Sequence, residues 1–301
     1  MRHATLVVAL AACALAPLVG QGDAGVLDVS LASRALEPGG VSVVTVKAAR
    51  PMESVSGQAF GRPVHFWPTA GSVEWYGLVA PGLGAKPGSY DVAVRGTGAG
   101  GVAASGKTSL VVEAKQFETR RLQVDPQFVN PPAAEAERIA REAKLLASLF
   151  TRTTDRLWRG PFERPVPGEA TSSFGRLTVL NGASRGRHQG ADFRAASGTA
   201  VRAPNAGRVV LAADLYFSGN TVVLDHGLGM FSLFAHLSRI GVGLGATVAR
   251  GDALGESGAT GRVTGPHLHW ALRLGELSVD PLALVAALSD LTESKGASPP
   301  R

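Results

Sequence analysis

The chain is poor in cysteine: Cys13 is the only one among its 301 residues. A single cysteine forms no disulfide within a chain, and it cannot supply a cluster of thiolate ligands for a metal. Cys13 also lies in an N-terminal apolar run, so removal of that run leaves no thiol at all. A disulfide-stabilised fold, a cysteine-ligated metal and a catalytic thiol are therefore excluded for the rest of the chain.

A strong charge of either sign is absent as well. There are 30 lysines and arginines against 24 aspartates and glutamates, a formal net charge of +6. No dense basic run carries this excess, so we expect no nucleic-acid partner, whereas an anionic polymer such as a cell envelope is compatible with it. The 45% hydrophobic and 18% charged residues are typical of a folded protein of one or two domains.

Beyond the N-terminus, no stretch is long and apolar enough to cross a bilayer. The start combines a basic Arg2, an apolar run over residues 4–19 and then small polar residues, the layout of a signal peptide over residues 1–22. We therefore predict export to the periplasm or cell envelope. Because Leu10–Cys13 resembles a lipobox, an outer-membrane lipoprotein with a lipid on Cys13 is the alternative. Membrane contact is expected only through the signal peptide or, in the alternative, through a lipid on Cys13.

Residues 25–115 are predicted to form an immunoglobulin-like β-sandwich. They contain short β-branched or aromatic runs separated by Pro/Gly turns, the pattern of a small all-β domain, at 41–48, 72–80, 89–96 and 107–114. His65 has no chemical partner nearby in the sequence, so we expect a structural role for it.

Residues 116–160 are predicted to be a connector with one helix. Asn130 is a suitable cap, and Pro131 and Pro132 suit a first turn. An apolar stripe at helical spacing predicts packing on a neighbouring domain, through Ile139, Ala143, Leu146 and Phe150. Short glycine-broken strands then predict a second β domain over residues 161–288, and residues 289–301 are expected to be a disordered tail.

This second β region holds five of the seven histidines, and two patterns among them suggest a metal site. His188 and Asp192 flank Gly190, which permits a tight bend. His267 and His269 are two residues apart and would share one face of a strand. A catalytic zinc takes three protein ligands and leaves a fourth position open, so His188, Asp192 and one histidine of the pair would complete such a site.

Two other functions are excluded by what residues 161–290 lack. There is no H-E-x-x-H helix, so the metalloprotease design with a glutamate base in that motif is absent. The glycine-punctuated strands resemble lipoyl and biotinyl carrier domains, but such a carrier needs a lysine, and this region has none.

Three segments in this order resemble the M23 peptidases, the lysostaphin/LytM-like zinc endopeptidases of peptidoglycan: RHQGADF (187–193), FAHLS (234–238) and GPHLHW (265–270). The resemblance covers roughly residues 170–283. It implies a mainly β chain whose C-terminal antiparallel β catalytic domain is of the LytM/duplicated-hybrid-motif type. It further implies one Zn2+ per chain and cleavage of peptide cross-links or stem peptides of peptidoglycan.

The resemblance also implies roles for single residues. His188, Asp192 and His269 are expected to bind the metal, and His236 and His267 to be catalytic. Where the family often has tyrosine, this chain has Phe234, so a hydroxyl that contacts substrate would be missing. His226 is expected to make only a structural hydrogen bond.

One alternative function comes from the same family. Some relatives have lost the metal ligands and act as non-catalytic regulators that activate cell-wall amidases. Every ligand is present here, which favours the enzyme. Besides peptidoglycan, envelope-assembly proteins are expected partners, since the helix and the N-terminal β domain can position the enzyme or cover its groove.

Overall fold

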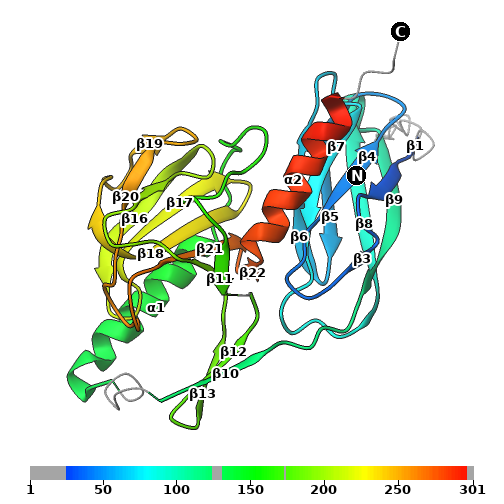
Figure 1. Cartoon of the computed structure of the whole chain (residues 1–301). Coiled ribbons are helices and arrows are strands. Elements are labelled where there is room, and N and C mark those ends of the chain that lie inside the picture. Colours follow the sequence, from blue (N-terminus) through cyan, green and yellow to red (C-terminus); the bar gives the residue numbers. More distant parts are fainter. Residues whose placement is uncertain (1–24, 124–130, 173, 297–301) are drawn as a thin grey trace, which may run out of the picture.

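The computed structural model describes residues 25–123, 131–172 and 174–296, and in these ranges the chain is mainly β with two α-helices. Two β units lie beside each other, with one helix between them and another below the C-terminal sheet (Figure 1). The predicted signal peptide and Cys13 lie outside the described residues. Neither helix has the length and apolarity needed to cross a membrane.

The N-terminal unit consists of nine strands in the order β1-β9-β8-β5-β6-β7-β4-β2, with β3 paired to β9. Their bounds are β1 Gly25–Val26, β2 Asp28–Leu31, β3 Ala35–Leu36, β4 Ser42–Lys47, β5 Met52–Ala59, β6 Arg62–Pro68, β7 Glu74–Val79, β8 Gly88–Gly98 and β9 Ala103–Val112.

Strand β6 belongs to both halves of this unit. Its first residues, from Arg62 to His65, pair with β5, and its last, from Phe66 to Pro68, pair with β7. One apolar cluster joins side chains from both halves, among them Val44, Val92 and Leu110. The predicted β runs are all strands here, and the unit has the two-layered form of a sandwich. Its immunoglobulin-like topology stays a prediction.

The connector contains helix α1 and one strand of a small sheet, whose other two strands belong to the region that follows it. In the sheet, strands β10 (Thr119–Leu122), β12 (Leu177–Leu180) and β13 (Ala183–Arg187) pair in the order β10-β12-β13. Helix α1 spans Ala136–Phe150 after a short 3-10 turn, with Glu135 at its N-cap, whereas the expected cap Asn130 lies outside the described residues.

The predicted stripe of α1 packs as expected at its C-terminal end. Phe150 stacks edge-on against Phe231, and Leu146 contacts the same apolar cluster on the C-terminal sheet. Ile139 is half-buried, whereas Ala143 is exposed, so the expectation for Ala143 is wrong.

The C-terminal unit is an antiparallel sheet of ten strands that curls into a nearly closed barrel (Figure 1). The main path is β11-β14-β21-β18-β17-β16-β19, with β20 joining β15 to β18 and β22 paired to β21. The bounds are β11 Ala170–Ser172, β14 Ala191–Phe193, β15 Ala200–Arg202, β16 Gly207–Leu215, β17 Gly219–Gly227, β18 Met230–Ile240, β19 Thr247–Val248, β20 Ala253–Ser257, β21 Leu268–Leu274 and β22 Leu277–Val279.

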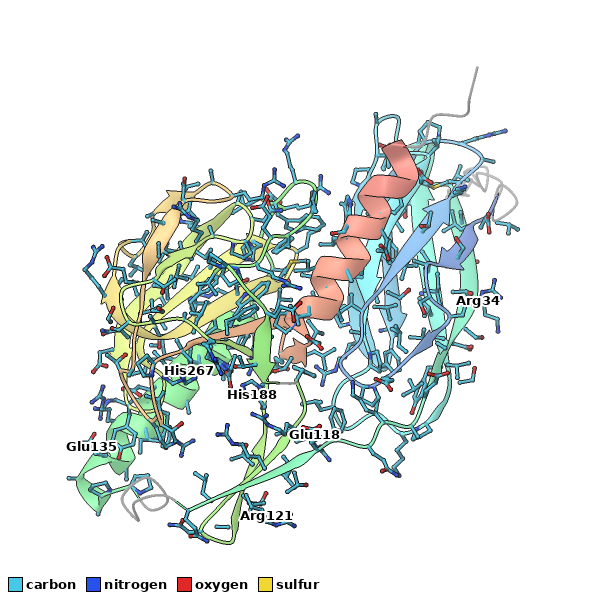
Figure 2. The ribbon with its side chains drawn as sticks, in the orientation of Figure 1. Arg34, Glu118, Arg121, Glu135, His188 and His267 are labelled. Carbon is cyan, nitrogen blue, oxygen red and sulfur yellow. The ribbon has the colours of Figure 1, made fainter. Side chains whose placement is uncertain are left out.

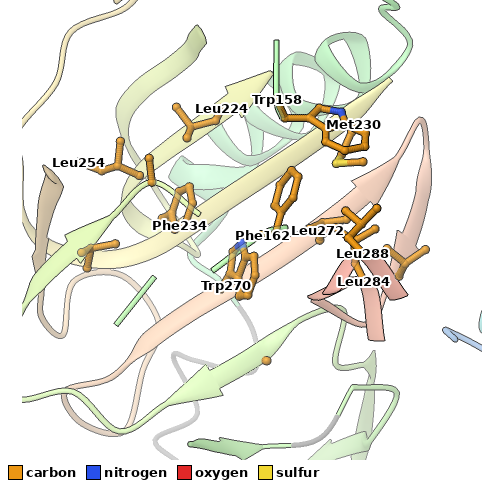
Figure 3. Packing of buried hydrophobic residues seen from close by; sticks show 14 of the residues in the cluster. Trp158, Phe162, Leu224, Met230, Phe234, Leu254, Trp270, Leu272, Leu284 and Leu288 are labelled. Atoms are coloured by element: carbon orange, nitrogen blue, oxygen red, sulfur yellow. The ribbon is translucent and has the colours of Figure 1, made fainter. Parts of the chain in front are cut away.

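The main hydrophobic core lies inside this sheet and continues into the N-terminal unit. Trp270, Phe234 and Leu254 fill its centre (Figure 3). Trp67 and Tyr76 of the N-terminal unit belong to the same cluster, so the two units share buried surface. The predicted domain limits stay a prediction.

The expected disordered tail is wrong up to Gly296. Helix α2 runs from Pro281 to Gly296 and lies between the two units (Figure 1). Its buried Leu284 and Leu288 join the core, and Ser289 donates a hydrogen bond to the carbonyl oxygen of Val285. The chain is helical here because apolar side chains at helical spacing pack on the core, and the polar composition of residues 289–296 does not indicate this packing. Residues 297–301 lie outside the described range.

Candidate metal centre

The register of two strands brings the metal-ligand candidates together. Strands β14 and β21 pair antiparallel, with Asp192 directly opposite His269. Directly paired residues project to the same face of a sheet, so the carboxylate and the imidazole meet. His188 precedes β14 and reaches the same point, and His267 shares the face of His269 by strand alternation.

Three ligand atoms converge in this place. The Nε2 atom of His188 lies 3.0 Å from Oδ1 of Asp192 and 3.0 Å from Nδ1 of His269. The Nδ1 atom of His269 lies 2.9 Å from the same carboxylate oxygen. All three atoms therefore form one tight triangle, the group in the described chain that could hold a metal ion.

Protons alone do not satisfy this triangle. If both imidazole nitrogens carry protons, two N–H groups face each other, and if only one does, a nitrogen lone pair faces the carboxylate. A cation bound by two imidazole nitrogens and one carboxylate oxygen removes both conflicts. Two histidines and one acidic residue with an open fourth position is the donor set of catalytic zinc, so the residues fit the predicted ion.

The titration of the cluster agrees with a site that favours charge on Asp192. Burial raises the pKa of Asp192, but hydrogen bonds with His188 and His269 outweigh this and hold that pKa well below its usual range. Burial lowers the pKa of His269, which favours the neutral imidazole that a metal needs.

Gly190 allows the ligands to approach, although not as a left-handed bend. Its φ lies outside that region. A Cβ atom at this position would lie 2.5 Å from the carbonyl oxygen of Trp270 and 2.8 Å from Cε1 of His269. Glycine is needed here because the chain passes against β21 and the His269 ring.

His236 is aimed by a bulge in β18. Against β17, the three residues from Asn220 to Val222 oppose the four from Phe234 to Leu237, and His236 has φ 65°, in the left-handed region. Such bulges redirect side chains and are common beside active sites.

Backbone contacts fix the tautomer of His236. Its N–H donates to the carbonyl oxygen of Ser218 at 2.8 Å, and its ring Nδ1 donates to the carbonyl oxygen of Thr260 at 2.9 Å. Burial lowers the pKa of His236 to about 4, an effect that the hydrogen bond to Thr260 only partly offsets. The ring is neutral at pH 7, with its Nε2 as the unprotonated acceptor.

His267 is held in the same tautomer. Its Nδ1 donates to the carbonyl oxygen of Gly265 at 2.9 Å, and its Nε2 lies 3.9 Å from Oδ1 of Asp192. The rings of His267 and His236 are 4.9 Å apart between centroids. Two imidazoles with proton-accepting Nε2 atoms thus lie beside the ligand triangle.

All five histidine and aspartate candidates line one groove of about 730 Å3. The groove lies where the C-terminal sheet faces the small β10-β12-β13 sheet, and His188 and His267 appear close together there (Figure 2). Leu146 of α1 forms part of its wall, and Phe217 and Arg262 form another part.

Two other sequence expectations have clear outcomes. His226 is fully buried away from the groove, donating to the carbonyl oxygen of Ala206 and accepting from Ser232, as its structural role predicted. Phe234 is fully buried in the core, so the expected loss of a substrate contact there is wrong. Its neighbour in β18, Ala235, faces the groove instead.

The groove also contains residues that sequence reasoning missed. Ser218, which lines the groove, and Thr260, which does not, hold His236 through their backbone carbonyl oxygens, and backbone carbonyls leave no sequence signal. Phe217 and Arg262 lie outside the recognised motifs.

Comparison with known proteins gives one family. The model of peptidase family M23 matches residues 186–281. A crystal structure from Pseudomonas aeruginosa described as a peptidase M23 is 32% identical, with a TM-score of 0.62, over 83% of this chain and 94% of that one.

Curated relatives match in the same region. Peptidoglycan DD-endopeptidase ShyA of Vibrio cholerae is 46% identical over 85 residues, 28% of this chain and 20% of ShyA. DD-carboxypeptidase/endopeptidase Mpg of Neisseria meningitidis is 36% identical over 111 residues, 37% of this chain and 26% of Mpg. The chain thus spans a fifth to about a quarter of the length of these two relatives.

Proposed function

Because the chain belongs to peptidase family M23, we propose that it is a zinc-dependent endopeptidase that cleaves stem peptides or peptide cross-links of bacterial peptidoglycan. The observation that carries this proposal is the triangle of His188, Asp192 and His269 with two further histidines beside it. The names of the relatives support the substrate class.

His188, Asp192 and His269 hold the metal in this proposal. Bound zinc acts as a Lewis acid toward the scissile carbonyl and lowers the pKa of water to about 7. The protein's own part is to keep three donor atoms within 3.0 Å of one another, which the β14–β21 register supports.

His236 and His267 move protons. Both present an unprotonated Nε2 in the neutral state, because both Nδ1 atoms donate to backbone carbonyls. One ring accepts the proton of the attacking water, and the resulting imidazolium donates a hydrogen bond to the developing oxyanion. The intact ligand set weighs against the alternative of a non-catalytic amidase activator.

Mass spectrometry of purified sacculi after digestion tests the proposal. We expect cross-linked muropeptides to fall, with new ends that identify the bond, and a zinc chelator to abolish the loss. The D-alanyl–diaminopimelate cross-link is the bond that we expect to be cut. Unchanged sacculi after treatment with folded, zinc-loaded protein would contradict the enzyme and favour the regulator.

A further inference from the structure

One polar side chain of the groove, Gln189, belongs neither to the ligand triangle nor to the two histidines beside it. Gln189 follows His188 in the sequence, is exposed and lines the same groove. Its side-chain carbonyl oxygen accepts two hydrogen bonds, from Nη2 of Arg273 at 2.9 Å and from the hydroxyl of Ser278 at 3.0 Å. Donors from two strands, β21 and β22, therefore hold one exposed amide.

These partners settle which end of the Gln189 amide is the oxygen. A guanidinium only donates hydrogen bonds, so the amide atom that faces Arg273 must be the acceptor. The amide nitrogen, Nε2, is on the other side of the amide carbon, and within the part of the chain that the structure describes it makes no hydrogen bond. Two N–H donors at the groove thus remain for a ligand.

The strand register places the donors to Gln189 on the face of the sheet that carries the ligand candidates. Arg273 and His269 are four residues apart on β21, so their side chains project to the same face. Ser278 of β22 pairs directly with Arg273 and shares that face. Four residues span roughly 13 Å, so the amide is held a few residues of an extended bound peptide away from His269.

The two donors are themselves held in place. The guanidinium carbon of Arg273 lies 4.5 Å from the ring centroid of Phe150 at the end of α1, and its Nη1 donates to the carbonyl oxygen of Glu276 at 3.0 Å. Ser278 is buried. A hydrogen bond from a charged donor also polarises the amide, which strengthens its N–H groups as donors. The structure thus orients this donor before any ligand binds, as substrate positioning requires.

We propose that the Gln189 carboxamide donates a hydrogen bond to a main-chain carbonyl oxygen of the stem peptide bound in the groove. An acceptor is the partner that fits, because the free end of the amide only donates, and a peptide main chain offers carbonyl oxygens along its length. The bond forms away from the reacting atoms, so it sets the register of the peptide relative to His236 and His267. This inference rests on the proposed function and adds a residue that positions its substrate.

The variant Gln189→Glu separates this role from a structural one. A carboxylate still accepts from Arg273 and Ser278, but its second oxygen cannot donate to the peptide. With a synthetic D-alanyl–diaminopimelate cross-linked peptide dimer as substrate, we expect KM to rise about tenfold or more, because a hydrogen bond is lost and two acceptor oxygens meet. We expect kcat to change less than about twofold, since this bond is the same before and during the reaction.

Two variants control for the added charge and for the substitution itself. Gln189→Met removes the donor without adding a charge and is expected to raise KM about 3- to 10-fold. Gln58→Glu makes the same chemical change at an exposed position of β5, outside the groove, and should behave as the wild type. Zinc content and thermal unfolding verify that each variant keeps its metal and its fold.

A wild-type KM in Gln189→Glu would overturn the inference, as would a loss confined to kcat. An effect in Gln189→Glu with none in Gln189→Met would assign it to the added charge and overturn the inference as well. If folded, zinc-loaded wild-type protein does not cut the dimer, the proposed function fails, and calorimetric titration with the dimer decides the inference. Tighter binding by the wild type than by Gln189→Glu would then support it, and equal binding or none would overturn it.

Discussion

At the scale of the residue, His226, His236 and His267 all donate from Nδ1 to a backbone carbonyl, and they differ in whether the Nε2 atom has a hydrogen-bond partner within the fold. In His236 and His267 the Nδ1 atom donates to a carbonyl, so Nε2 is left for chemistry. In His226 both nitrogens are used, by Ala206 and Ser232, so that ring serves only the fold. The same side chain therefore has different roles because its second nitrogen is either committed or not.

Replacing a metal ligand tests the triangle directly. His188→Ala removes one of three donor atoms, and we expect zinc content to fall to background and cleavage to fall at least 100-fold. Metal analysis by mass spectrometry and muropeptide release measure the two effects. His65→Asn is the matched control, since this histidine lies in the N-terminal unit, and it should retain both. A variant lacking His188 that still cuts at the wild-type rate would refute the ligand assignment.

His226 makes stability depend on pH. Burial lowers its pKa to about 4, partly offset by the hydrogen bond to Ala206. Because the unfolded imidazole titrates near 6.5, the unfolded state binds the proton first, and stability is lost as pH falls from 6.5 toward 4. We expect this group to contribute about 2 kcal/mol of the loss in unfolding free energy between pH 7 and pH 5.

The variant His226→Asn keeps a donor toward Ala206 but does not titrate. Denaturant unfolding at pH 7 and pH 5 should show a smaller pH dependence than in the wild type. An unchanged dependence would mean that His226 is not the group responsible.

At the scale of the element, the site depends on strand pairing and a bulge. Asp192 opposes His269 across β14 and β21, and Ala235 opposes His269 across β18 and β21. The bulge in β18 then turns His236 toward the groove. Short strands with this register position the candidate ligands, as a helix does in the H-E-x-x-H motif.

A methyl group between β14 and β21 tests this arrangement. Gly190→Ala places a Cβ against Trp270 and the ring of His269, and we expect it to separate the strands, destabilise the fold by about 2 kcal/mol and weaken zinc binding at least tenfold. Competitive zinc titration and thermal unfolding report both losses. Gly243→Ala, where the Cβ meets nothing within 4 Å, should behave as the wild type. Wild-type zinc affinity in Gly190→Ala would show that the close approach is unimportant.

At the scale of the whole molecule, the groove is not made by the C-terminal sheet alone. Leu146 of α1 and Gln123 after β10 contribute to its wall. Arg138 of α1 pairs with Glu142 and Asp214, and Glu142 accepts from the N–H of Tyr216, so the helix is tied to the sheet. Parts outside the M23 match therefore shape access to the site.

Removing residues 25–158 should change activity in a defined way. We expect faster cleavage of small cross-linked peptides because the groove loses one wall, and a lower Tm because Trp67 and Tyr76 leave the shared core. The rate on whole sacculi should differ from that of the full chain. Equal rates for both proteins on peptides and sacculi would show that the N-terminal part does not influence the enzyme.

The sequence alone determined the types of residue and their order. His188 with Asp192, His236, and His267 with His269 carry the family resemblance, and His226 was expected only to make a structural hydrogen bond. The β runs and the stripe of α1 followed from local periodicity, because period 2 and period 3.6 are properties of neighbouring residues. These features depend on chemistry that is close along the chain.

Only the tertiary structure decided how these residues meet. His188 and His269 are 81 positions apart, and their contact depends on the β14–β21 register. The left-handed His236, the loop that carries Arg262 and the wall formed by α1 depend on backbone contacts between distant segments. Residues 289–296 are helical because α2 packs on the core, and this packing is not visible in the sequence. Long-range pairing is set by the packing of the whole chain, which no local pattern encodes.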